Sequence, residues 1–148
     1  MSEQERAELP APGWDPVTTG YWKAAGQGRL VVQRCTACGA HRWPPAWACY
    51  ACQSTDWEWD EVPGTGTVFT YTWADQRPDM STPIYNISVI ELDGTKGEPV
   101  RIMTQVLDVD KDTLRCDLPV EVTFVPFDDE VAVPMFRPRV DSSLRGVR

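Results

Sequence analysis

The stretch that decides the fold reads CTACGAHRWPPAWACYAC and covers residues 35–52. It holds two C-x2-C pairs, Cys35 with Cys38 and Cys49 with Cys52, separated by ten residues. Each pair lets one tight turn direct two thiolates at the same ion, and two such turns face to face supply the four sulfurs, at about 2.3 Å, that tetrahedral Zn²⁺ requires. The stretch has neither helical nor strand periodicity and cannot form a core alone, so the sequence predicts a ribbon held by a metal ion.

Four cysteines close the coordination shell and leave no position for water, so the pattern favours a structural metal over a catalytic one. Iron stays open as the ion, because the same four sulfurs bind it in rubredoxin-type sites. Gly39 follows the first pair, where a positive φ lets backbone amides approach the sulfurs, and Gln53 stands in the equivalent place of the second pair and is less suited to it. Arg34 and Arg42 flank the pairs, and we expect them to offset part of the negative charge of the site.

The sequence shows no catalytic relay. His41 is the single histidine, and we expect it at the surface or beside the metal site rather than as a ligand. Cys116 stands apart from both pairs with no histidine near it, and we interpret it as a small apolar filler near a turn. The aspartates lie in predicted turns, where backbone hydrogen bonding favours them. An enzyme in its own right is therefore the third of our hypotheses.

Outward from the ribbon, the sequence pattern changes at residue 63 to short strand-like segments separated by turns. These segments predict a small barrel with strands at 67–74, 84–92, 100–109, 119–125 and 131–136. Before the ribbon, Asp15 and Pro16 predict a short helix over residues 16–26, which Gly20 weakens. The domains we expect are a flexible tail (1–14), the helix and ribbon (15–62), the barrel (63–138) and a C-terminal tail (139–148).

Composition narrows the class of protein. The 148 residues include 14 basic and 22 acidic side chains, for a net charge of −8, and 42% apolar content is enough for a core. This charge disfavours binding to nucleic acid or to an anionic membrane, since both depend on clustered Lys and Arg. Residues 1–12 lack the features of a signal peptide, and no run of about 18 apolar residues occurs. We therefore expect a soluble, cytoplasmic protein with no membrane segment.

One feature keeps a nucleic-acid hypothesis open. Phe69, Tyr71 and Trp73 alternate along the first long strand, and we expect them on one face, where such a row can stack the bases of a single strand. Stacking platforms work inside basic grooves, however, and the five predicted strands contain a single basic residue, Arg101. The row is more typical of a core or an interface.

The ordered set of motifs resembles a known family. Its parts are Tyr21-Trp22, GRLVVQRC at 28–35, CTACG, the Arg42–Pro45 stretch, CYAC, GTGTVFTYT at 64–72 and MFRP at 135–138. This set, spanning residues 15–138, is similar to the bacterial and archaeal family that joins a rubredoxin-like zinc ribbon to an OB-fold. The resemblance implies a mainly β protein: an N-terminal helix and rubredoxin-like zinc ribbon followed by a five-stranded OB-fold barrel. It also implies structural Zn²⁺ on the four ribbon cysteines.

The resemblance further implies a function. Such proteins look like non-catalytic accessory subunits of thiolase-superfamily enzymes, either thiolases or retro-aldolases, that act on acyl-CoA thioesters, with steroid side-chain degradation as one setting. We expect a hetero-oligomer around an enzyme dimer; a subunit of an acyl-CoA hydratase complex stays open as an alternative. The residues predicted to contact a partner or ligand are Tyr21, Trp22, Trp43, Trp47, Tyr85 and Arg77, the last being the cation of the 76–85 loop that could meet a CoA phosphate.

Overall fold

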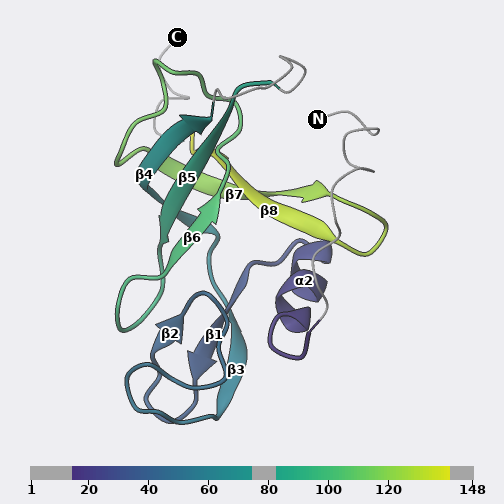
Figure 1. Cartoon of the computed structure of the whole chain (residues 1–148), viewed down its shortest axis with the longest axis vertical. Helices are drawn as coiled ribbons and strands as arrows, with labels where there is room; N and C mark the ends of the chain where they lie inside the picture. Colours follow the sequence, from purple (N-terminus) through teal and green to yellow (C-terminus); the bar gives the residue numbers. More distant parts are fainter. Residues whose placement is uncertain (1–14, 75–82, 141–148) are drawn as a thin grey trace.

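A small sheet lies at one end of the molecule and a larger curled sheet at the other (Figure 1). The computed structural model describes residues 15–74 and 83–140. This arrangement confirms the predicted order of a short helix, a ribbon and a small β barrel. The elements are α2 (Thr19–Gly26), β1 (Val31–Cys35), β2 (His41–Arg42), β3 (Trp57–Glu61), β4 (Thr65–Ala74), β5 (Tyr85–Leu92), β6 (Arg101–Thr104), β7 (Pro119–Pro126) and β8 (Ala132–Pro138).

The small sheet has the antiparallel order β2-β1-β3 and carries the ribbon. Strand β1 is nearly all buried and ends at Cys35, so it delivers the first metal-binding turn. Strand β3 lies antiparallel to β1, with residues pairing from Val31 opposite Glu61 to Cys35 opposite Trp57. The short strand β2 pairs Gln33 with Arg42 and positions the loop that leads to the second cysteine pair.

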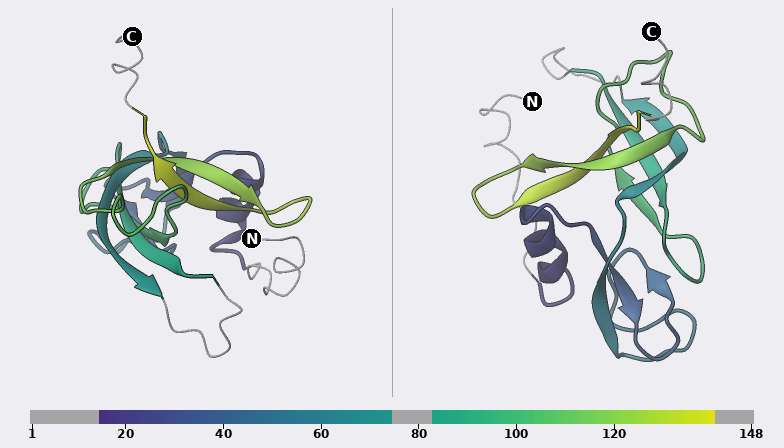
Figure 2. Two further views of the ribbon diagram at one scale, coloured as in Figure 1. Left: turned by 90° about the horizontal axis from the view of Figure 1, so that it is seen from above. Right: turned by 180° about the vertical axis from the view of Figure 1, so that it is seen from behind.

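The large sheet has the order β6-β5-β4-β7-β8 and curls until its ends meet, as the view from above shows (Figure 2). Closure runs through residues 105–107, where Val106 forms a parallel bridge with Phe136 of β8 and the Leu107 N–H donates to the Phe136 carbonyl at 2.7 Å. The predicted strand over 100–109 is thus too long, because the chain leaves β5 after Thr104 to reach β8. Buried Asn86 fills the gap, accepting from the Val106 N–H and donating to its carbonyl.

Helix α2 begins three residues later than predicted. The Asp15 carboxylate accepts the Val17 and Thr18 N–H groups, which makes residues 16–18 a turn ahead of the helix. Gly20 is explained by packing: a Cβ there would overlap the indole of Trp59, so glycine lets the helix lie close against β3. Within residues 15–74 and 83–140, no helix has both the length and the apolar character needed to cross a membrane.

One apolar cluster joins the helix, ribbon and barrel. It includes Tyr21 from α2, Val32 from β1, and Val68, Ile90 and Phe136 from the barrel, the last four being fully buried. The Val62 N–H donates to the Leu30 carbonyl at the point where the ribbon passes into the barrel. Because the core is shared, the ribbon is anchored by packing at its base and needs a metal ion only at its tip.

Candidate functional site

The four ribbon sulfurs converge on one point. All of them lie within 4.8 Å of one another, and the Cys35–Cys52 and Cys38–Cys49 sulfur pairs are each 3.6 Å apart. A tetrahedron with bonds of about 2.3 Å places its sulfurs about 3.8 Å apart, so these side chains fit Zn²⁺ without rearrangement. When bound, the ion supplies structural cross-linking of the ribbon tip and no reaction chemistry, because the four thiolates fill its shell.

The two cysteine turns are built alike. The Gly39 N–H donates to the Cys35 carbonyl at 2.9 Å, and the Gln53 N–H donates to the Cys49 carbonyl at 3.0 Å. Gly39 has φ of 78° and Gln53 has φ of 64°. Gln53 therefore adopts the left-handed conformation that we expected to suit it poorly, and the hydrogen bond to Cys49 holds it there.

Backbone amides set the acidity of the thiols. The N–H of Cys52 points at the Cys49 sulfur and lowers its pKa to about 6, and the N–H of Cys38 likewise lowers the pKa of Cys35. The Ser54 N–H acts to lower the pKa of Cys52, but the neighbouring thiols, with Cys35 first, and burial together raise it. The backbone amides thus favour the thiolate form of Cys35 and Cys49, the buried pair, and the thiolate is the form that binds a metal ion.

The flanking arginines do not contact the sulfurs. Arg34 pairs with Glu58 at 2.8 Å on the surface. Arg42 is buried, and donates from Nε to the Gln33 side-chain oxygen at 2.7 Å and from Nη2 to the Ala46 carbonyl at 2.8 Å. Across the described ranges neither guanidinium forms a hydrogen bond with a cysteine, so any offset of the negative charge of the site acts without direct contact.

His41 joins the ribbon to the barrel. Its side chain is only 3% exposed, so of the two placements we expected, at the surface or beside the metal site, the surface position is wrong. Nδ1 accepts the Lys96 N–H at 2.8 Å, so the ring proton is on Nε2, which donates to the Asp60 carboxylate at 2.7 Å. The His41 N–H also donates to the Lys96 carbonyl at 2.8 Å. We call this set the junction latch; with both ring nitrogens bonded, His41 has no lone pair for a metal or a reaction.

Cys116 is exposed, which overturns its interpretation as a buried apolar filler. It follows β6 in a loop that leads to β7, outside the group of sulfurs that could hold a metal. Among the described residues, no histidine other than His41 exists to activate it. A nucleophilic relay is therefore absent from this part of the chain.

The aromatic row expected on β4 is broken by a β-bulge. The register with β5 shifts between Val68 and Thr70, so Phe69 falls on the outside while Tyr71 and Trp73 turn inward and pack against the core. Phe69 is 48% exposed, with the Arg101 guanidinium 3.7 Å above its ring centre. The three-ring stacking platform on which the nucleic-acid alternative rested does not form.

The outer surface of β4, β5 and β6 presents apolar side chains to solvent. On β5, Tyr85 and Ile87 alternate with buried Asn86 and Ser88 and so point outward. We define the barrel face as Phe69, Tyr85, Ile87 and Met103, which are 48%, 42%, 36% and 71% exposed. Large apolar side chains exposed together on one face of a sheet are typical of an interaction site.

The residues predicted to contact a partner lie in different places. Tyr21 is buried and packs on Trp43 with ring centres 4.5 Å apart, so it belongs to the core and is not offered to a partner, a correction to our expectation. Trp22 and Trp43 are half-buried, Trp47 is 66% exposed, and Tyr85 lies on the barrel face. Arg77 lies outside the described residues. Our sequence reasoning missed Met103 and Ile87, whose alternation with buried residues was the available signal.

Comparisons with known proteins agree with this architecture. The ChsH2 rubredoxin-like zinc ribbon domain matches residues 22–58, and the ChsH2 C-terminal OB-fold domain matches residues 59–125. A solved structure, the Ltp2-ChsH2(DUF35) aldolase, is 33% identical with a TM-score of 0.76, covering 87% of this chain and 99% of that one. A DUF35 protein of unknown function from Sulfolobus solfataricus is 15% identical with a TM-score of 0.59, covers 93% of this chain and 92% of that one, and shows a shared fold alone.

A curated relative is longer than this chain. It is a probable enoyl-CoA hydratase alpha subunit from Thermomonospora curvata, 34% identical over 139 residues. The match covers 93% of this chain and 42% of that protein, so the chain spans less than half the length of the relative.

Proposed function

Because this chain belongs to the ChsH2 family, which joins a rubredoxin-like zinc ribbon to an OB-fold, we propose that it is a non-catalytic accessory subunit of a complex acting on acyl-CoA thioesters. Two relatives support this: one is part of the Ltp2-ChsH2(DUF35) aldolase, and the other is a probable enoyl-CoA hydratase alpha subunit. The partner we propose is a thiolase-superfamily retro-aldolase, with the CoA ester of a steroid side chain as the substrate class.

The observation that carries this proposal is the barrel face. It places four large apolar side chains on one outer surface of a chain whose net charge is −8. The charged groups beside it, Arg101 and Glu91, pair with each other at 2.9 Å, so the face carries no unpaired charge from them. The free energy of the system falls when an apolar surface of another protein covers such a face.

The absence of catalytic machinery in the described ranges is consistent with an accessory role. Both ring nitrogens of His41 are engaged in the junction latch, and the ribbon thiols are arranged for a metal ion. A second candidate, a subunit of an acyl-CoA hydratase complex, is favoured by the name of the curated relative. Both candidates require the same docking and differ in the enzyme that is bound.

Co-purification with matched variants tests the docking. Met103→Lys puts a charge on the barrel face at a side chain that is 71% exposed, and Val140→Lys puts the same charge at a side chain that is 70% exposed outside that face. We expect Met103→Lys to weaken capture of the partner enzyme from the native host at least tenfold, because a lysine ammonium would lose water in an apolar contact. Val140→Lys should capture it normally.

Mass spectrometry of the captured protein then distinguishes an aldolase from a hydratase. Equal capture by the two variants would show that the barrel face does not contact the partner enzyme. Turnover of an acyl-CoA by the isolated chain would refute the accessory role itself.

A further inference from the structure

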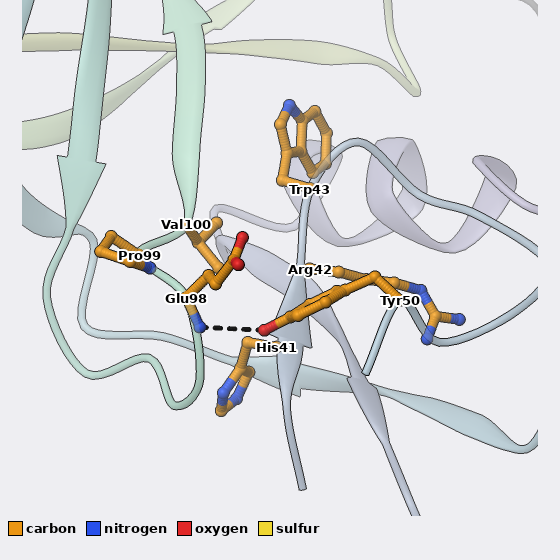
Figure 3. Close-up of a pocket in the computed structure, with 7 residues that line it drawn as sticks. All are labelled: His41, Arg42, Trp43, Tyr50, Glu98, Pro99 and Val100. Atoms are coloured by element: carbon orange, nitrogen blue, oxygen red, sulfur yellow. Dashed lines mark hydrogen bonds between the residues drawn. The ribbon is translucent and has the colours of Figure 1, made fainter. Parts of the chain in front are cut away.

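A cleft of about 90 Å³ opens where the ribbon meets the loop between β5 and β6 (Figure 3). The ribbon supplies Trp43 and Tyr50 to its lining, and the barrel supplies Glu98, Pro99 and Val100. The cleft thus depends on both halves of the chain. It lies beside the junction latch and takes no part in the proposed metal centre.

The walls of the cleft are held in place. The Tyr50 hydroxyl accepts the Glu98 N–H at 2.9 Å, which fixes the loop against the ribbon. Gly97 has φ of 90°, and a Cβ there would crowd the Tyr50 hydroxyl, so glycine allows this approach. Val100 is buried at the base and Trp43 packs against the core. The cleft is therefore preformed, which lowers the entropy cost of filling it.

The size of the cleft limits what can enter. Sites for cofactors and drug-sized molecules occupy about 300–1,000 Å³, several times the volume here. The whole coenzyme A molecule is therefore too large to be the occupant. A volume of about 90 Å³ suits the end of one amino-acid side chain.

Charge selects the kind of side chain. The Glu98 carboxylate has no ion-pair partner within residues 15–74 and 83–140, and in Figure 3 it points toward Trp43, above the Tyr50 ring. Arg42 also lines the cleft, but its guanidinium is tied to Gln33 and Ala46 and points away from Glu98.

We propose that this cleft binds the side-chain ammonium of a lysine on the surface of the partner protein. The methylene stem would lie against Pro99 and Val100, and the ammonium would face the Glu98 carboxylate and the rings of Tyr50 and Trp43, which attract cations through their faces. Exposed Tyr50, which lines the cleft, is of a residue type enriched at protein interfaces. The assignment of this lysine to a partner protein rests on the proposed function, whereas the ammonium site itself does not.

Nuclear magnetic resonance with n-butylammonium chloride tests the site on the full chain. We expect saturable shifts of the Gly97 and Glu98 amide signals. Glu98→Gln should weaken the binding by about 1.4-fold to fivefold, the range for one exposed ion pair. Asp129→Asn removes an exposed carboxylate of the β7–β8 turn and should leave the binding unchanged. Uncharged butan-1-ol should bind no better to the natural chain than to Glu98→Gln.

A titration without amide shifts, or equal binding by Glu98→Gln and Asp129→Asn, would overturn the proposal. Preference for sodium butyrate over butylammonium would overturn it as well, since Arg42 would then select the ligand. Capture of the partner enzyme, compared between the natural chain and Glu98→Gln, separates the two proposals. If the natural chain binds butylammonium but captures no partner enzyme, the ammonium site stands and the accessory function is refuted.

Discussion

Replacing His41 with alanine should uncouple the ribbon from the barrel. The imidazole makes two hydrogen bonds from a buried position, one to Asp60 on β3 and one to the Lys96 amide in the β5–β6 loop. Alanine keeps the backbone hydrogen bond from residue 41 to the Lys96 carbonyl, because that bond does not involve the side chain. The variant therefore removes the side-chain part of the junction latch alone.

The magnitude follows from these contacts. A hydrogen bond to a charged group contributes about 1.5–3 kcal/mol, and a neutral one about 0.5–1.5 kcal/mol. Asp60 is 42% exposed, so its bond belongs at the lower end of the range. The two together predict a loss of about 2–3 kcal/mol in the free energy of unfolding, or roughly 6–9 °C in Tm at roughly 3 °C per kcal/mol for a chain of this size.

Urea unfolding at saturating zinc measures the change, since a fixed excess of ligand keeps its contribution constant. Hydrogen exchange locates it: the Lys96 amide, which bonds to the imidazole, should lose protection, while the Gly39 amide, which bonds to the Cys35 carbonyl, should keep it. Arg34→Ala is the matched control, because it removes a ribbon cation whose pair with Glu58 is exposed and contributes less than about 1 kcal/mol.

Two results would refute this reasoning. If His41→Ala costs no more than Arg34→Ala, the latch does not stabilise the junction. If the Gly39 and Lys96 amides lose protection together, the imidazole supports the whole ribbon rather than its contact with the barrel.

Three further predictions follow from local geometry. Cys49→Ser should abolish stoichiometric zinc in elemental analysis of the pure protein while Cys116→Ser retains it; retention by both variants would contradict the four-sulfur site. Gly20→Ala should lower the free energy of unfolding by about 1–3 kcal/mol in thermal melts despite its better helix propensity, because the new Cβ overlaps the Trp59 indole; a stabilised variant would show that α2 moves freely. Asp110 accepts hydrogen bonds within its own turn, which lower the pKa of its carboxyl, so this stabilisation is present above pH 3.8 and lost as pH falls through the lower folded value. The protection factors of the Asp112 and Thr113 amides, measured relative to unstructured peptides at each pH, should fall only in this acid range, and amides without protection at neutral pH would contradict the assignment.

Much of the fold could be predicted because its signals are local. Two C-x2-C pairs specify two sulfur-bearing turns whatever surrounds them, and alternating apolar residues predict strands over a few residues. The zinc ribbon, the five barrel strands and the family followed from such patterns, and the structure and comparisons confirm them. The predicted helix bounds and strand lengths were less accurate, because contacts with neighbouring elements decide where a helix or strand begins and ends.

The site beyond the metal centre depends on contacts between distant residues. His41 meets partners 19 and 55 positions away, so no local pattern distinguishes it from a surface histidine. A bulge of one residue turned Phe69 outward from Tyr71 and Trp73, although their spacing in the sequence is regular. The sequence by itself determined which turns hold a metal ion and what kind of sheet forms. Only the tertiary structure decided which side chains face solvent, because one step in strand register exchanges the two faces of a sheet.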